Sequence, residues 1–229
     1  PSGQVHKKET NTMANASTTG FGLRTSMTLG NTPATSGQSN YKIKSGLGVG
    51  IFKNNPVSLQ DAGGDQGYLQ DASFATTDDG GAGGAAYENT GHAPLIGVFN
   101  GAFYIDNATS KPTFANSVAA STTFGTDYNT GSNDGIGFVN DNPQQEYVIK
   151  ADAAVTQAMI GDAGYNTNSF TAGNAKDGQS TVTLDIGGGA ATTHMFKLVR
   201  SADDVENNDL SAVGANVIVA IAQASNLYN

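Results

Sequence analysis

The segment LIGVFNGAFY at Leu95–Tyr104 is the most apolar stretch of the chain. On both sides of Gly101, large apolar residues occupy every second position: Ile96 and Val98 before it, and Phe103 and Ile105 after it. This two-residue period is typical of a β-strand. A glycine inside such a pattern marks a bulge or a tight bend. The segment therefore predicts a strand, a bulge or turn at Gly101, and a second strand.

Similar short apolar patterns recur on both sides of this segment, separated by Gly, Asn, Asp, Ser and Thr. They lie at Tyr41–Ile43, Val49–Phe52, Gly137–Asn140, Gln145–Lys150, Val182–Ile186, Met195–Arg200 and Val217–Ile221. One short helix is expected at Asp152–Met159, with Asp152 as N-cap and Gly161 as its end. Roughly eight to ten short strands predict a mainly β protein. We expect a small β-barrel or a β-tulip or sandwich-like body with long loops.

The polar N-terminal segment predicts a division of the chain. Residues 1–40 are rich in Thr, Asn, Ser and Gly and contain too little apolar surface to form a core alone. We interpret them as an extended docking arm on a β-rich body at residues 41–229, with a possible subdivision of the body near 130–145. The alternative is that residues 1–40 wrap around their own body.

Charge is unevenly distributed along the chain. The net charge is −9, which divides into +4 over residues 1–44 and −13 over residues 45–229. An acidic body repels phosphate, which argues against nucleic-acid binding. A mildly basic segment on an acidic body fits an assembly protein with one docking region. The basic residues of that segment are the candidate partner-binding residues: Lys7, Lys8, Arg24, Lys42 and Lys44.

The composition excludes several classes of site. The chain has no Cys, so disulfides, thiolate metal sites and Cys catalysis are ruled out. No apolar stretch approaches the ~18 residues of a membrane span. The three histidines, His6, His92 and His194, form no HxxxH or HxH pair, and no nucleophile elbow or Walker A sequence occurs. We therefore expect no catalytic residue, no metal and no cofactor.

Two acidic clusters offer oxygen ligands, but neither has the spacing of an EF-hand loop. They are Asp78-Asp79 and the group Asp203, Asp204, Glu206 and Asp209. Paired carboxylates also occur in glycoside hydrolases. Such enzymes normally bind sugars in an aromatic cleft, and this chain has no Trp. Solvated loops are the preferred interpretation of both clusters.

Several segments together resemble a family of structural proteins from environmental tailed phages. The first is YKIKSGLGVGIFKNNPVSL at Tyr41–Leu59. The others are GVFNGAFYID at Gly97–Asp106, Phe114 with Ala120-Ser121-Thr122, FVNDNP at Phe138–Pro143 and VIKADAAV at Val148–Val155. The resemblance covers about Tyr41–Gly164, roughly half of the chain. This sequence lacks the Trp-Pro that precedes Ala-Ser-Thr in the family, and residues 1–40 and 165–229 match it less well.

The resemblance implies a non-enzymatic protein of the phage head, namely a decoration (cement) protein that binds the major capsid protein on the outer surface of the virion. Decoration proteins of this kind are commonly trimers at three-fold positions, so a homotrimer is the favoured oligomer. No nucleic-acid or membrane partner is expected.

Three alternatives remain open. The first is a tail or minor head protein. The second is a virion-borne carbohydrate-binding module, for which Tyr87, Tyr128 and Tyr165 are the candidate platform residues. The third is a hydrolase of surface glycans.

Overall fold

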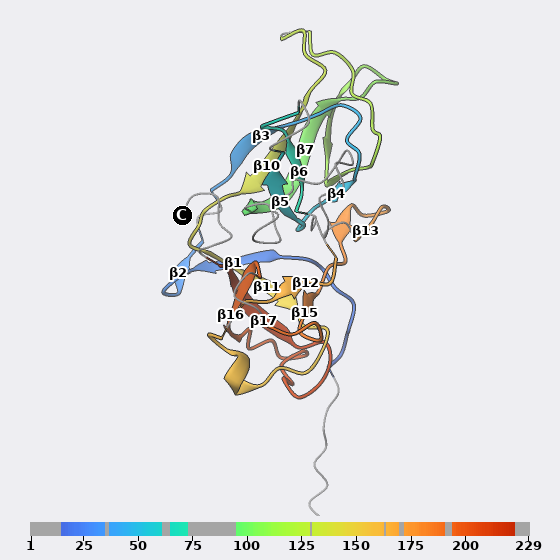
Figure 1. Ribbon diagram of the computed structural model, residues 1–229. Coiled ribbons are helices and arrows are strands. Elements are labelled where there is room, and N and C mark those ends of the chain that lie inside the picture. The colour runs from blue at the N-terminus through green and yellow to red at the C-terminus, as the bar shows by residue number, and fades with distance from the viewer. Residues whose placement is uncertain are drawn as a thin grey trace, which may run out of the picture.

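The computed structural model describes residues 15–34, 37–60, 65–72, 95–128, 130–162, 164–169, 172–190 and 194–222. The predicted mainly β fold is confirmed, with two larger antiparallel sheets (Figure 1). The five-stranded sheet has the order β16 (Phe196–Ser201), β17 (Asn216–Ile221), β11 (Gln145–Lys150), β1 (Arg24–Thr28) and β2 (Thr32–Pro33). The six-stranded sheet has the order β3 (Ser39–Ile43), β10 (Gly135–Asn140), β7 (Leu95–Ile105), β5 (Pro56–Leu59) and β6 (Leu69–Asp71), with β8 (Pro112–Ala115) also paired to β7.

Three two-stranded ladders connect the loops around these sheets. They pair β4 (Ile51–Phe52) with β9 (Ser117–Val118), β12 (Asn166–Thr167) with β15 (Leu184–Asp185), and β13 (Gly173–Asn174) with β14 (Gln179–Ser180). The chain passes from the six-stranded to the five-stranded sheet between Asn140 and Gln145. That crossing falls in the range in which the sequence allowed a subdivision of the body.

Strand β7 contributes to both hydrophobic cores. Opposite β5, Val57 pairs with Gly97 and Ser58 with Leu95, so one residue of β7 is extra at this point. Such a bulge reverses the alternation of side chains. Leu95 and Val98 consequently pack in the core of the five-stranded sheet, whereas Ile96 and Phe99 pack in the core of the six-stranded sheet. Strand β7 thus contributes side chains to both cores, although it pairs only within the six-stranded sheet.

The expected interruption at Gly101 is a bulge within one continuous strand. In the pairing of β10 with β7, Phe138 lies opposite Gly101 and Val139 opposite Phe99, which leaves Asn100 as the extra residue. Leu95–Ile105 therefore forms a single eleven-residue strand, and of the two possibilities that the sequence left open, the bulge is the one observed.

The six-stranded sheet curls strongly. Strands β3 and β6, at the two ends of the pairing order, approach each other. Gly137 on β10 permits this curl, because a Cβ atom there would lie 2.6 Å from a methyl carbon of Leu69 and 3.1 Å from one of Ile43. Its interior is filled by side chains of five strands: Ile43, Val57, Leu69, Ile96, Phe99, Ala102 and Val139.

The prediction of a helix at Asp152–Met159 is wrong, because this stretch contains only a single 3₁₀ turn, at Gln157–Met159. Tertiary contacts hold the preceding backbone in extended form. The Asp152 N–H donates to Leu184 O at 3.0 Å, and the Asp152 carboxylate accepts the Ile186 N–H at 2.8 Å. The Val155 N–H donates to Leu210 O at 2.7 Å. These bonds outweigh the helix propensity of the alanines.

Residues 15–34 differ from the free docking arm that the sequence predicted. Strand β1 pairs with β11, and Leu23 is fully buried in the core of the five-stranded sheet. Gly20 lies so close to the body that a Cβ atom would be 2.1 Å from Thr181 O. For this stretch the alternative interpretation holds, namely that the segment wraps around its own body.

Candidate functional site

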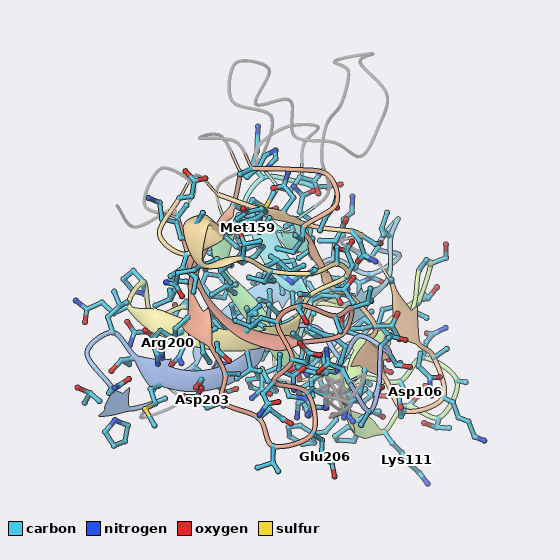
Figure 2. All side chains as sticks on the ribbon, turned by 90° about the horizontal axis from the view of Figure 1, so that it is seen from below. Asp106, Lys111, Met159, Arg200, Asp203 and Glu206 are labelled. Carbon is cyan, nitrogen blue, oxygen red and sulfur yellow. The ribbon has the colours of Figure 1, made fainter. Side chains whose placement is uncertain are left out.

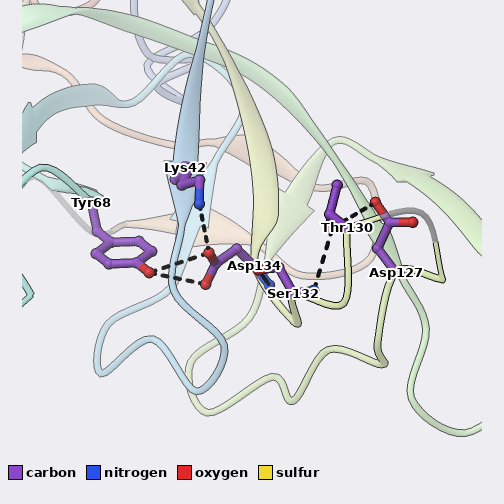
Figure 3. A network of polar contacts seen from close by, with 6 residues as sticks. All are labelled: Lys42, Tyr68, Asp127, Thr130, Ser132 and Asp134. Atoms are coloured by element: carbon purple, nitrogen blue, oxygen red, sulfur yellow. Dashed lines mark hydrogen bonds and ion pairs between the residues drawn. The ribbon is translucent and has the colours of Figure 1, made fainter.

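Lys42 and Lys44 each form an ion pair with an aspartate of the same chain. The Lys42 ammonium donates to Asp134 at 3.1 Å, and the Tyr68 hydroxyl donates to the same carboxylate at 3.1 Å (Figure 3). Lys44 forms an ion pair with Asp65. Tyr68 and Asp65 precede β6, whereas both lysines lie on or next to β3, so this network joins the two ends of the curled sheet.

The pKa values agree with compensated charges. The hydrogen bond to Asp134 raises the pKa of Lys42. Partial burial favours a higher pKa for Asp134, but hydrogen bonds from Lys42, Ser132 and Tyr68 outweigh it and the pKa is lowered. Both groups are therefore charged at neutral pH, and the pair offers a partner little net charge.

The other candidate basic residues are not brought together with these lysines. Arg24 lies on β1 of the five-stranded sheet, where its guanidinium stacks over the Phe21 ring at 4.1 Å. Lys7 and Lys8 lie outside the described residues. The described candidates thus lie on two different sheets, Arg24 on the five-stranded sheet and the two lysines on or next to β3 of the six-stranded sheet.

The outward face of the six-stranded sheet instead carries a row of apolar side chains. Ile136 on β10 lies directly opposite Phe103 on β7, and Phe103 lies opposite Phe114 on β8. Phe138 is two residues along from Ile136 and shares its face. Phe114 is 76% exposed. We call this set, Phe103, Phe114, Ile136 and Phe138, the aromatic face.

The aromatic face has a defined internal geometry. The ring centroids of Phe103 and Phe114 are 4.8 Å apart, and those of Phe114 and Phe138 are 6.4 Å apart with planes only 12° from parallel. Gly101 lies opposite Phe138 and has no side chain to fill the space between the rings. A hollow of about 260 Å³ results, lined by Asn100, Gly101, Ala102, Phe114, Ala115, Asn116 and Phe138.

Exposed aromatic side chains are unusual because their burial is normally favourable. Contiguous apolar groups on a surface commonly mark an interaction site, and aromatic residues are enriched at protein interfaces. Lys42 and Asn40 on β3 flank the face, opposite Ile136 and Phe138 respectively. The arrangement suits the binding of an apolar protein surface or of a flat ring stacked on Phe114.

The residues that the sequence proposed for a carbohydrate platform do not form one. Tyr165 is buried, with only 2% of its surface exposed, and packs in the core of the five-stranded sheet. Tyr128 is exposed, and Tyr87 lies outside the described residues. The prediction for Tyr165 is wrong because its backbone pairs with Phe196 at the edge of the sheet.

The acidic segment 203–209 is a braced surface loop. The Asp204 carboxylate accepts the backbone N–H groups of Glu206 and Asn207 at 2.9 and 3.0 Å, and the Asn216 side chain at 3.0 Å. Asp203 and Glu206 lie at the surface (Figure 2). The other cluster, Asp78-Asp79, lies outside the described residues.

Little in the described parts of the chain suggests metal chemistry. Within them, no group of three or more His, Asp or Glu side chains converges to hold an ion. His194 contacts Gly164 O through Nδ1 at 3.1 Å, and His6 and His92 lie outside the described ranges. None of the described helical segments has the length and hydropathy for crossing a membrane.

Comparisons with protein-family models, curated proteins and solved structures find no match.

The aromatic face was missed from the sequence for a definite reason. Phe114 lies in a turn-rich stretch, and its position beside Phe103 depends on the hairpin register between β7 and β8. The one available signal was Ile136 and Phe138, because two apolar residues occupy outward positions of a strand whose inward residues are Gly137 and Val139.

Proposed function

We propose that this chain is a non-enzymatic structural protein of a tailed-phage particle, which binds the assembled head as a decoration protein. The observation that carries the proposal is the aromatic face, whose Phe114 ring is 76% exposed on strand β8, opposite Phe103. A protein surface that covers this face removes apolar area from water, which stabilises the complex by about 25 cal/mol per Å² before the costs of association.

The resemblance to phage structural proteins supports the same proposal. The resembling segments coincide with strands that build the aromatic face and its support: Tyr41–Leu59 holds β3, β4 and β5, Gly97–Asp106 lies within β7 and its turn, and Phe138–Pro143 ends β10. The acidic charge of residues 45–229 favours the outer surface of the head, because packaged DNA repels it.

In this account the chain acts mechanically. The partner is the major capsid protein, and a homotrimer is the favoured oligomer. Repeated copies on the lattice gain avidity from neighbouring contacts. A protein that binds only the assembled shell stabilises that shell by mass action.

The test compares two exposed aromatic residues. The variant Phe114→Ser removes the most exposed ring of the aromatic face, and Tyr128→Ser removes a ring that is 86% exposed elsewhere. Both proteins should fold like the wild type. In sedimentation with purified capsids that lack the protein, we expect Phe114→Ser to bind at least about tenfold more weakly and Tyr128→Ser to bind normally. Equal binding by all three proteins would contradict the proposal.

A virion-borne carbohydrate-binding module is the second candidate, and the hollow between Phe114 and Phe138 favours it. Sugar rings stack on aromatic faces, and the amides of Asn100 and Asn116 line the same hollow. Chemical-shift changes confined to these residues on addition of host-surface glycans, without binding to capsids, would support this candidate instead. A tail or minor head protein is distinguished by its low copy number.

A further inference from the structure

Lys150 is a buried amine that donates hydrogen bonds to neutral oxygens. It lies at the end of β11 with 2% of its surface exposed. Its Nζ atom lies within hydrogen-bond distance of three oxygens, namely Ser17 O at 2.8 Å, Gly214 O at 3.1 Å and Asn207 Oδ1 at 3.3 Å. Within the part of the chain that the structure describes, no ion pair involves it.

The contact with Asn207 differs from the other two, because a side-chain amide is a chemically replaceable group. Asn207 is 8% exposed and lies between β16 and β17. Its Oδ1 atom also accepts the Ser17 backbone N–H at 3.1 Å. The Asn207 side chain also contributes to the lowered pKa of Asp204, whose carboxylate accepts the Asn207 backbone N–H at 3.0 Å. The Asn207 side chain is thus positioned beside the amine through its Oδ1 atom.

This arrangement contains the groups that are needed for transamidation, in which an amine replaces the nitrogen of a side-chain amide. Burial lowers the pKa of Lys150, which increases the fraction of neutral, nucleophilic amine. The Ser17 N–H is placed to stabilise negative charge on Oδ1. The χ2 angle of Asn is soft, so the amide plane can turn until Cγ faces Nζ. The Asp204 carboxylate accepts the Asn207 backbone N–H, so it is available to relay a proton to the departing nitrogen.

We propose that Lys150 and Asn207 form an intramolecular isopeptide bond. The lone pair of the neutral Nζ atom attacks Cγ of Asn207, and the Cγ–Nδ2 bond breaks. The proton released by Nζ passes to Nδ2 through Asp204, and the nitrogen leaves as ammonia. The product is an amide between the two side chains, and the step requires no oxidant, reductant or other co-reactant.

The bond joins β11 to the connection between β16 and β17. The crosslink lies at the end of β11, where the N-terminal segment packs against the sheet, since Ser17 contacts both Lys150 and Asn207. A chain crosslinked in this way cannot separate these strands fully when it unfolds, which limits the conformational freedom of the unfolded chain as a disulfide does. The proposal is independent of the particle on which the protein acts.

Mass spectrometry of the full chain tests the bond directly. The expected intact mass is smaller than the sequence mass by one molecule of ammonia. Trypsin should fail to cut after Lys150, and a branched peptide should join the segment that ends at Lys176 to residues 201–229. An intact mass equal to that of the sequence, together with cleavage after Lys150, would show that Lys150 is only a buried ammonium and overturn the proposal.

Two variants separate the proposed bond from other losses of ammonia. Lys150→Met and Lys197→Met each remove one lysine, and Lys197 is exposed on β16. The mass deficit should disappear in Lys150→Met and persist in Lys197→Met. Because Lys150→Met can impair folding, Asp204→Asn provides a second readout, and its mass deficit should develop more slowly after synthesis. A deficit that persists in Lys150→Met would place the lost ammonia elsewhere and contradict the proposal.

Discussion

At the scale of single residues, the most consequential polar contact of the described chain is the pair of Glu146 and Arg200. The Glu146 side chain is 1% exposed, and the Arg200 guanidinium donates to both of its carboxylate oxygens, at 2.8 and 2.5 Å. Arg200 also donates to Asn31 at 3.1 Å. One arginine thus binds the centre of the five-stranded sheet to the turn between β1 and β2.

Removal of this arginine should be costly. Arg200→Ala leaves a buried carboxylate without its partner, so we expect a loss of about 3 kcal/mol in the free energy of unfolding, at the low end for buried pairs because Arg200 itself is partly exposed. Urea denaturation measures the loss. Lys42→Ala is the control, because Lys42 is 66% exposed and its ion pair should contribute less than about 1 kcal/mol. Equal losses in the two variants would contradict this interpretation.

Gly97 provides a test of the bulge that β7 needs. A Cβ atom there would lie 2.1 Å from the backbone oxygen of Asn140, and neither backbone can move without disturbing the pairing of β7 with β10. Gly97→Ala should therefore lower the free energy of unfolding by about 3 kcal/mol or more. Gly48→Ala is the control, since no atom lies within 4 Å of a Cβ at that position. A small effect at Gly97 would show that the bulge is adaptable.

At the scale of elements, the sequence predicts the strands well and their partners poorly. Met195–Arg200 and Val217–Ile221 were expected as strands and lie in β16 and β17, because alternating apolar residues have to face a core. The periodicity of Gln145–Lys150 does not reveal that the strand pairs with β1 rather than with β10. That choice depends on long-range packing, in which Leu23 fills the core beside β11.

The N-terminal segment shows why residues 1–40 misled the sequence interpretation. Residues 15–34 are mostly polar, yet their backbone groups are satisfied by the body, as in the bonds from Ala16 N to Glu206 O and from Leu23 N to Asn54 O. A hydropathy pattern does not record backbone hydrogen bonds. The aromatic face was hidden for a related reason, since it exists only in the register of three paired strands.

Truncation tests the part that β1 has in the fold. A chain that begins at Asn15 keeps these contacts, and its Tm should be close to that of the full chain. A chain that begins at Leu29 loses β1 and Leu23, so its Tm should fall by more than about 10 °C or folding should fail. Circular dichroism during heating distinguishes the two outcomes. A cooperative transition at the wild-type temperature in the shorter chain would show that β1 is dispensable.

The turn of the β7–β8 hairpin predicts a pH dependence. Hydrogen bonds from the side chain and backbone N–H of Thr109, at 2.8 and 2.7 Å, lower the pKa of Asp106. A carboxyl group with a lower pKa in the folded chain stabilises the fold above its unfolded pKa, and this contribution is lost as the pH falls through the folded pKa.

The variant Asp106→Asn removes this titration. The wild type should be the more stable protein at pH 7, and the difference should shrink as the pH falls from about 5 to about 2. The midpoints of urea denaturation at several pH values measure this difference in stability. The variant Asp185→Asn, which removes a carboxylate at another position, is the control. A difference in stability that does not change with pH would mean that the hydrogen bonds from Thr109 stabilise aspartate and asparagine at position 106 equally well.

At the scale of the whole molecule, the features combine into one mechanical account. Strand β7 contributes side chains to both cores, the curled sheet presents the aromatic face, and the N-terminal segment packs on the five-stranded sheet beside Lys150. Residues 45–229 carry a charge of −13, which agrees with the proposed outward position on a DNA-filled particle. In the proposed role, the aromatic face holds the partner while the paired strands resist separation.

The most direct test of the proposed role is the copy number of the protein relative to the major capsid protein, measured by quantitative mass spectrometry of purified particles of the tailed phage that we propose as its source. The account predicts a ratio near one to one, or a simple symmetric fraction of it. A few copies per particle would assign the protein to the tail or a vertex, and its absence from particles would contradict the structural role altogether.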